Sequence, residues 1–248
     1  MGSISNIIKK QWGIETTEKA PGELSQEAKK YFEELKQPIK EKPKKVYTMQ
    51  ELKHQFNAVA NELTGEFIVN NENKDILTTL FYYFTANDTE FKKEALKTVK
   101  NKPSLNKGIL LIGNMGSGKT QILDIFKQLK WQSFSRCTVY DVVEAFEKNG
   151  EKGLDIFFRG NRFFDELGAE RQAAFYGTKE DVLTRILEKR YSSFRDLGLK
   201  THVTTNLSQK QIANRYGQRL EGRILEMFNI IYLGGSTDYT DFRKLKHQ

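Results

Sequence analysis

From residue 107 onward, short apolar runs alternate with longer amphipathic segments. Gly108–Ile112 is an apolar run bounded by glycines, which predicts a buried strand. Further strands are predicted at Ser133–Tyr140, Phe163–Glu166, Thr201–Thr205 and Ile230–Leu233. Apolar residues at helical spacing predict helices at Gln121–Lys130, Asp141–Phe158 (interrupted near Gly150 and Gly153), Asp181–Leu197 and Gln209–Phe228. This alternation predicts an α/β fold with a parallel sheet covered by helices on both faces.

The first hundred residues have a different, polar and helical pattern. One apolar stripe at helical spacing is made by Ile4, Ile7, Ile8 and Trp12. It indicates either an ordinary core helix or a stripe that grips a partner protein. Pro38–Lys45 holds two prolines and four Lys against one Glu, which is typical of a solvated linker.

A second helical region follows the linker. Thr48 and Glu51 have the spacing of a capping box, and apolar residues recur behind them on one helical face. The aromatic residues of the next stretch, which include Phe81 and Phe84, have the spacing of a core rather than of a base-stacking platform. We therefore predict three parts: a helical segment with its basic linker over 1–46, a helical region leading into the core over 47–106, and the core over 107–248.

Composition and charge exclude several classes of protein. The 248 residues hold 40 Lys and Arg against 32 Asp and Glu, a net charge of +8 that permits contact with nucleic acid without proving it. No apolar run approaches the ~20 residues of a membrane-spanning helix, and Met1–Gln11 lacks the pattern of a signal peptide. The single Cys137 and three scattered His exclude an internal disulfide and a Cys-rich zinc site. A reducing, cytoplasmic setting without membrane contact fits best.

One motif carries specific chemistry. Gly113–Thr120 matches the phosphate-binding pattern G-x-x-x-x-G-K-[ST], with a predicted strand before it and a helix after it. Glycines let successive backbone N–H groups face phosphate oxygens, and the helix adds its positive dipole end. We expect Lys119 to reach the β- and γ-phosphates of ATP and Thr120 to ligate Mg²⁺. The predicted cradle consists of Gly113, Asn114, Met115, Gly116, Ser117, Gly118, Lys119, Thr120 and Gln121.

An acidic pair follows the third predicted strand. Asp165 and Glu166 come after Phe163 and Phe164, where an apolar strand of these proteins delivers an Asp to the Mg²⁺ shell. The adjacent Glu166 would polarise the attacking water, which favours hydrolysis over transfer to another acceptor. The alternative is an ordinary acidic pair at an exposed strand end.

Together these motifs resemble those of AAA+ ATPases of the DnaC/IstB type, the group of bacterial helicase loaders and transposition helper ATPases. The resemblance covers about 107–236. It includes Thr204–Leu207, similar to the sensor-1 segment, where Asn206 would reach the γ-phosphate or the lytic water; a helix N-cap is the alternative. It also includes Tyr216–Met227, similar to the box with an arginine finger, Arg223 being the better candidate and Arg219 the second. A solvated helix face is the alternative for both arginines.

The resemblance has further implications near the end of the chain. Only 15 residues follow Leu233, so we expect no helical lid, as in the DnaC type. Ser236 matches the sensor-2 region of the family, but Arg243 is displaced from the expected position, which puts a sensor-2 role in doubt. The N-terminal hundred residues show no motif of the family.

The function that the resemblance implies is that of an ATP-hydrolysing replicative helicase loader that binds single-stranded DNA. Its partners would be the helicase and other copies of the chain, which assemble through the arginine-finger face and leave the isolated ATPase slow. Two alternatives stay open: a transposition helper that binds duplex DNA and a transposase, and an ATP-dependent switch or adaptor with negligible turnover.

Overall fold

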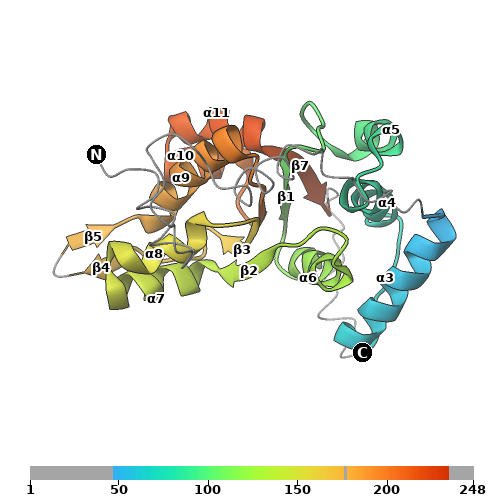
Figure 1. Cartoon of the computed structure of the whole chain (residues 1–248), viewed down its shortest axis with the longest axis horizontal. Helices are drawn as coiled ribbons and strands as arrows, with labels where there is room; N and C mark the ends of the chain where they lie inside the picture. The colour runs from blue at the N-terminus through green and yellow to red at the C-terminus, as the bar shows by residue number, and fades with distance from the viewer. Residues whose placement is uncertain (1–46, 176–177, 235–248) are drawn as a thin grey trace, which may run out of the picture. The chain divides into compact units, whose positions relative to one another are not determined.

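The computed structural model describes residues 47–175 and 178–234 (Figure 1). Its elements in chain order are α3 (Met49–Thr64), α4 (Lys74–Phe84), α5 (Asp88–Thr98), β1 (Gly108–Gly113), α6 (Lys119–Leu129), β2 (Ser135–Thr138), α7 (Val139–Asn149), α8 (Glu151–Phe158), β3 (Arg162–Leu167), β4 (Ala173–Phe175), β5 (Thr178–Glu180), α9 (Val182–Leu197), β6 (Thr201–Thr205), α10 (Gln209–Tyr216), α11 (Gln218–Met227) and β7 (Phe228–Leu233).

Five strands form one parallel sheet in the order β2-β3-β6-β1-β7. From β1 the chain continues to β2, on the side of β1 where β6 and β3 also lie. It later enters β7, which lies on the opposite side of β1. All carboxyl ends therefore lie at one edge, and the loops after β1, β3 and β6 are neighbours there. A crevice at this edge, where the strand order reverses, is where open parallel sheets bind ligands.

Both faces of the sheet are covered by helices, and the alternation along β1 shows it. Ile109 and Leu111 belong to a buried cluster with α3, α4, α5 and α6, whereas Leu110 and Ile112 belong to a second cluster with α7 to α11. Figure 1 shows α3, α4 and α6 on one side of the strands and α7 to α11 on the other. Together with the phosphate-loop motif between β1 and α6, this arrangement confirms the predicted fold class.

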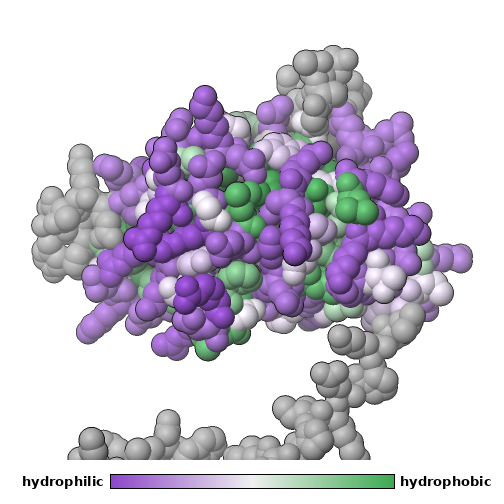
Figure 2. Space-filling view, turned by 90° about the horizontal axis from the view of Figure 1, so that it is seen from above, coloured by the Kyte–Doolittle hydropathy of each residue, from purple (hydrophilic) through white to green (hydrophobic). Residues whose placement is uncertain are grey.

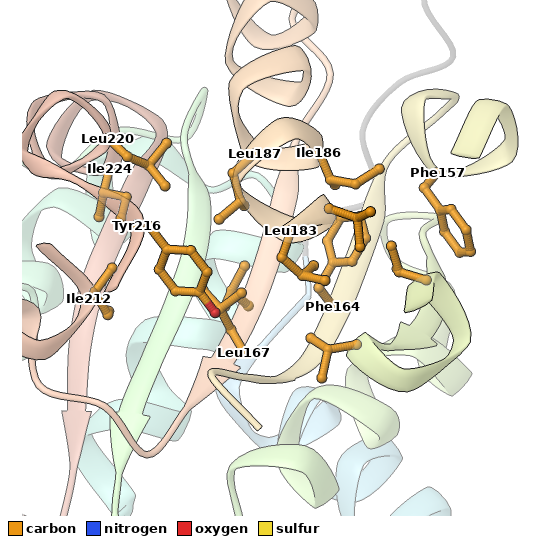
Figure 3. Packing of buried hydrophobic residues seen from close by; sticks show 14 of the residues in the cluster. Phe157, Phe164, Leu167, Leu183, Ile186, Leu187, Ile212, Tyr216, Leu220 and Ile224 are labelled. Atoms are coloured by element: carbon orange, nitrogen blue, oxygen red, sulfur yellow. The ribbon is translucent and has the colours of Figure 1, made fainter. Parts of the chain in front are cut away.

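The second cluster centres on α9 (Figure 3). Leu183, Ile186 and Leu187 project from α9 toward the sheet, and the side chains of α10 and α11 lie beside them. The first cluster is rich in aromatic rings: Phe84 stacks on Phe126 of α6 at 4.5 Å between ring centroids. The predicted core role of the aromatics in α4 is confirmed, because Phe81 and Phe84 are buried. The predicted capping box is also present, with Thr48 as the N-cap of α3.

Two predicted boundaries are wrong, and a glycine and a helix cap explain them. The helix predicted at 209–228 is divided into α10 and α11 by Gly217, whose φ of 92° ends one helix and precedes the next. The interruption predicted near Gly150 is confirmed, because Gly150, with φ 58°, separates α7 from α8, whereas α8 continues through Gly153. The strand predicted at 133–140 stops at Thr138, because this residue forms a capping box with Asp141 and begins α7.

The short antiparallel pair β4–β5 was not predicted. It follows the loop after β3, and Glu147 of α7 accepts a hydrogen bond from the backbone N–H of Ala174 there, at 3.3 Å. Three-residue strands hold too few residues for a period-2 pattern to stand out.

The surface of the described part is mainly polar. The face seen in Figure 2 is largely hydrophilic, with separate smaller hydrophobic areas between the charged side chains. Among the described residues, no helix combines the length and the apolar character that crossing a membrane requires.

Two buried basic side chains lie near the amino end of β6, opposite the edge where the strands end. Arg190 of α9 is fully buried and donates to Thr201 Oγ1 and to the backbone oxygens of Phe158, Gly160 and Lys200. His202 of β6 is buried too, and its Nδ1 accepts a hydrogen bond from the backbone N–H of Ile109 at 3.2 Å. Burial, with Lys200 and Arg190 nearby, lowers the pKa of His202 to about 3, so the ring is neutral in the folded protein.

We predict that His202 makes the fold acid-sensitive. Its pKa is lower in the folded than in the unfolded chain, so its contribution to stability is complete above about pH 6.5 and is lost as the pH falls toward 3. Between pH 7 and pH 5 this costs about 2 kcal/mol of unfolding free energy. Urea unfolding at both pH values should show this extra loss in the wild type and in His54→Gln but not in His202→Gln. Equal pH dependence in all three proteins would contradict the prediction.

Candidate functional site

The site lies where three loops meet at the carboxyl edge of the sheet. The loop after β1 carries the phosphate-binding motif, the loop after β3 carries the acidic pair, and the end of β6 carries Asn206. Because β6 lies between β1 and β3, the three predicted groups of residues come together although they lie up to 93 positions apart in the chain, between Gly113 and Asn206.

The phosphate-binding loop has the backbone conformation that its glycines allow. Gly116 and Gly118 have φ values of 81° and 86°, in the region that side chains disfavour. A Cβ placed on Gly113 would lie 2.3 Å from the backbone oxygen of Leu233, so only glycine fits there. A Cβ on Gly118 would meet no atom within 4 Å, which leaves open space in front of the loop. Helix α6 begins at Lys119 and directs its N-terminus toward the loop.

Lys119 is buried within its own loop and reaches across to β6. Its Nζ donates to the backbone oxygens of Gly113 and Asn114, each at 2.8 Å, and to Asn206 Oδ1 at 2.8 Å. The structure thus brings together the predicted phosphate-binding lysine and the predicted sensor-1 amide. An ammonium held at this position can bind the terminal phosphates of a nucleotide, and the amide lies within reach of the same oxygens.

Asp165 is the buried anion of the site, with 3% of its surface exposed. Its Oδ1 accepts hydrogen bonds from the hydroxyls of Thr120, at 2.7 Å, and Thr204, at 2.6 Å. Its Oδ2 accepts from Arg136 at 2.6 Å. A buried carboxylate is stable only when it is paired and hydrogen-bonded, and here the donors come from α6, β6 and β2.

Glu166 adopts an unusual backbone conformation next to Asp165. Its φ of 63° is in the left-handed region, which costs a non-glycine residue about 1 kcal/mol or more. The register between β3 and β6 shifts between Phe164 and Leu167, and the N–H of Glu166 donates to Thr204 Oγ1 at 2.9 Å. Its carboxylate makes no hydrogen bond or ion pair within residues 47–175 and 178–234. This conformation leaves the side chain available for chemistry at the edge of the sheet.

The oxygen donors fit Mg²⁺. The Thr120 hydroxyl and the Asp165 carboxylate are hard ligands 2.7 Å apart, at the start of α6. Mg²⁺ usually takes one or two protein oxygens and completes its shell with water and phosphate. In the described part of the chain, no group of three or more His, Cys, Asp or Glu could hold a metal without such help.

Three further residues complete the site. The segment similar to sensor 1 includes Thr204 but predicted no role for it, and no motif includes Arg136 or Asp124. Thr204 joins Asp165 to the backbone of Glu166. Arg136 of β2 pairs with Asp165 and also with Asp124 of α6, at 2.9 Å. The only sequence signal was indirect: Arg136 is a charge inside a predicted strand, and Asp124 lies four residues after Thr120, on the same face of a helix.

The loop after β3 is tied to α10. Gly168 N–H donates to Glu170 Oε2 at 2.8 Å, and Arg215 of α10 donates to the backbone oxygen of Gly168 at 2.9 Å. Arg215 also pairs with the buried Glu170 carboxylate at 3.0 Å. The hydroxyl of Tyr216, whose ring lies in the core in Figure 3, donates to Glu170 Oε1. Burial and then the Glu170 charge raise the pKa of Tyr216, which therefore stays protonated.

The two predicted arginine-finger candidates lie on α11 and make no contact with the cradle among the described residues. Arg223 pairs with Glu188 of α9 at 2.9 Å, and its guanidinium lies 4.8 Å from the centre of the Tyr191 ring. Arg219 is exposed and makes no hydrogen bond or ion pair within the same described part of the chain. Ser236, Arg243 and the segment in which we expected no lid lie outside the described residues, as does the stripe at Ile4–Trp12.

Comparison with known proteins gives structural matches only. No protein-family profile matches the chain. No curated protein matches it by sequence. Among solved structures it is similar to the DnaC helicase loader, with 18% identity and a TM-score of 0.48 over 69% of this chain and 95% of that one. It is also similar to DnaI, with 20% identity and a TM-score of 0.44 over 66% and 88% of the two chains.

A third similar structure is AMPPCP-bound DnaA from Aquifex aeolicus, with 18% identity and a TM-score of 0.46 over 73% of this chain and 52% of that one. At these identities and TM-scores, we base the function proposed below on this chain's own residues.

Proposed function

We propose that the chain is an ATP-binding and ATP-hydrolysing AAA+ protein that acts as a replicative helicase loader. The observation that carries the ATPase proposal is the convergence of Lys119, Thr120, Asp165 and Asn206 at one edge of the parallel sheet. The loader role is supported by the resemblance to the DnaC type, and contact with single-stranded DNA is supported by the net charge of +8.

In the proposed reaction, the backbone of Gly113–Gln121 and the N-terminus of α6 bind the phosphates, and Lys119 neutralises the terminal ones. Thr120 and Asp165 would hold Mg²⁺, which would supply positive charge to the phosphates. Glu166 accepts a proton from the attacking water, and Asn206 orients the γ-phosphate. Each of these roles uses a side chain that already lies at the edge of the sheet.

Two substitutions should distinguish nucleotide binding from ATP hydrolysis. Lys119→Ala should lower the affinity for a fluorescent ATP analogue at least about tenfold and abolish turnover, because the phosphates lose their cation. Glu166→Gln should bind the analogue within about threefold of the wild type but hydrolyse ATP at least about a hundredfold more slowly, because the general base is missing. Binding is measured by fluorescence and turnover by phosphate release.

Two exposed residues provide matched controls. Lys127→Ala removes a cation from the same helix as Lys119, and Glu144→Gln neutralises a carboxylate on α7; both variants should behave like the wild type. Unchanged turnover in Glu166→Gln would refute its role as the base, and unchanged binding in Lys119→Ala would refute the cradle itself.

We further propose that a neighbouring copy supplies the arginine finger, from Arg219 or Arg223. Such a residue can contribute about 10³ to 10⁵ in phosphoryl transfer, so the isolated subunit should be slow and its turnover should rise with protein concentration. Alanine at the finger position should abolish that rise. Mixing this variant with Lys119→Ala should restore turnover, since each supplies what the other lacks.

The two arginines differ in a way that separates function from stability. Arg223→Ala also removes the contacts with Glu188 and Tyr191, so it should lower the melting temperature, whereas Arg219→Ala should not. If neither variant loses turnover, or neither is rescued by mixing, the proposed finger is wrong.

DNA preference distinguishes the loader from the transposition helper. At fixed salt, a gel-shift with single-stranded and duplex oligonucleotides of equal length should show tighter binding to the single strand. A clear preference for duplex would favour the helper instead. Co-purification from native lysate provides the matching partner test, since a loader should retain a hexameric helicase and a helper should retain a transposase.

A further inference from the structure

The guanidinium of Arg136 lies between two carboxylates on the metal side of the site. Its Nη2 is 2.6 Å from Asp165 Oδ2, and its Nη1 is 2.9 Å from Asp124 Oδ2. Asp124 lies one turn after Thr120 on α6, and Asp165 binds the Thr120 hydroxyl directly. Arg136 therefore contacts the same carboxylate that is proposed to hold Mg²⁺.

Arginine is suited to this position. Its planar fork can bridge two carboxylates at once, which a lysine ammonium cannot do in the same geometry. The guanidinium carbon also lies 5.9 Å from the centre of the Phe163 ring. Although partial burial by itself lowers the pKa of Arg136, the hydrogen bond to Asp165 and the charge of Asp124 raise it overall. The residue is consequently a permanent cation.

This cation and a divalent metal have to share Asp165. Oδ1 of Asp165 is occupied by Thr120 and Thr204, and Oδ2 by Arg136. A metal that approaches Thr120 meets a positive charge already paired with its second protein ligand. Because the Asp165 side chain is 4% exposed, the repulsion between the two cations is poorly screened by solvent. Each cation must therefore weaken the binding of the other.

We propose that Arg136 is the resident counter-cation of the nucleotide site. It neutralises the pair Asp124–Asp165 when no metal is bound, allows a nucleoside triphosphate to bind without Mg²⁺, and reduces the gain in affinity that Mg²⁺ adds. This inference rests on the proposed function, since it requires a triphosphate in the cradle at Gly113–Gln121. It assigns Arg136 a positioning and charge-balancing role at the site, separate from the residues that carry out hydrolysis.

The test uses the dissociation constant of N-methylanthraniloyl-ATP, measured by fluorescence. The constant in excess EDTA is divided by the constant in excess Mg²⁺, and this ratio is compared between variants. In Arg136→Gln this ratio should rise about tenfold, which corresponds to about 1.4 kcal/mol. Without Mg²⁺ the two uncompensated carboxylates repel the triphosphate, and with Mg²⁺ the metal has Asp165 to itself. Arg136→Lys keeps the charge and should stay within about threefold of the wild-type ratio.

A second variant acts in the opposite direction and does not disturb the buried carboxylate. Asp124→Asn leaves Arg136 with one anionic partner, so metal-free nucleotide should bind more tightly and the ratio should fall below that of the wild type. The Asp124 side chain is 28% exposed, so this variant should fold even if Arg136→Gln does not. The matched control is Lys148→Gln, which removes an exposed cation from α7 that pairs with neither Asp124 nor Asp165 and should leave the ratio unchanged.

The outcomes separate this inference from the proposed function. If the wild type binds the analogue but the ratio does not change in folded Arg136→Gln or in Asp124→Asn, the role of Arg136 is wrong and the nucleotide site stands. If the wild type binds no analogue with or without Mg²⁺, the proposed function and this inference are both wrong.

Discussion

The candidate site depends on the compensation of one buried negative charge, the carboxylate of Asp165. A carboxylate removed from water is costly unless donors replace its hydration, and each donor here comes from a different element. Thr120 connects it to α6, Thr204 to β6 and Arg136 to β2. The same three hydrogen bonds hold the start of α6 against the ends of β3, β6 and β2. Loss of the charge would therefore loosen the geometry of the phosphate-binding loop as well as the metal ligand.

One of the hydrogen bonds that compensate the charge of Asp165 also affects the backbone conformation of the next residue, Glu166. Thr204 donates its hydroxyl proton to Asp165 and accepts the N–H of Glu166, which holds Glu166 in the left-handed conformation and shifts the register between β3 and β6. Strain of this kind persists only where the surroundings over-determine it. The strained residue is the one that we propose as general base, and its backbone conformation keeps its carboxylate out of the hydrogen-bond network of Asp165.

The site is physically connected to the helices that carry the finger candidates. The loop that begins at Gly168 is held by its own Glu170 and by Arg215 and Tyr216 of α10. Helix α11 follows directly after Gly217. Hydrogen bonds therefore connect the loop after β3 to α10, and Gly217 joins α10 to the helix that carries Arg219 and Arg223. Arg223 is held by Glu188 in the single chain, so a role in a neighbouring site would require that pair to separate.

The local features of this protein could be predicted from its amino-acid order. The apolar run before Gly113, the glycines of the loop and the alternation of strands and helices predicted the fold class, and the motifs named Lys119, Thr120, Asp165 and Asn206, whose side chains meet in the structure. These features depend on spacing along a short stretch of chain, where side-chain periodicity and backbone freedom act directly. Gly217 is itself a residue that commonly ends helices, but the helical periodicity on both sides of it predicted one continuous helix.

The partners that lie far apart in the chain could be identified only from the folded structure. Arg136 and Asp124 lie in no motif, and the motif that includes Thr204 predicted no role for it. The roles of Arg136 and Thr204 arise because β3 lies between β2 and β6. Asp124 joins them from α6 through its ion pair with Arg136. Strand order and register are set by packing over the whole sheet, and a shift by one residue would turn a strand residue such as Arg136 or Thr204 to the other face. Spacing along the chain carries no record of such long-range pairing, so the charge balance of the site emerged only with the folded structure.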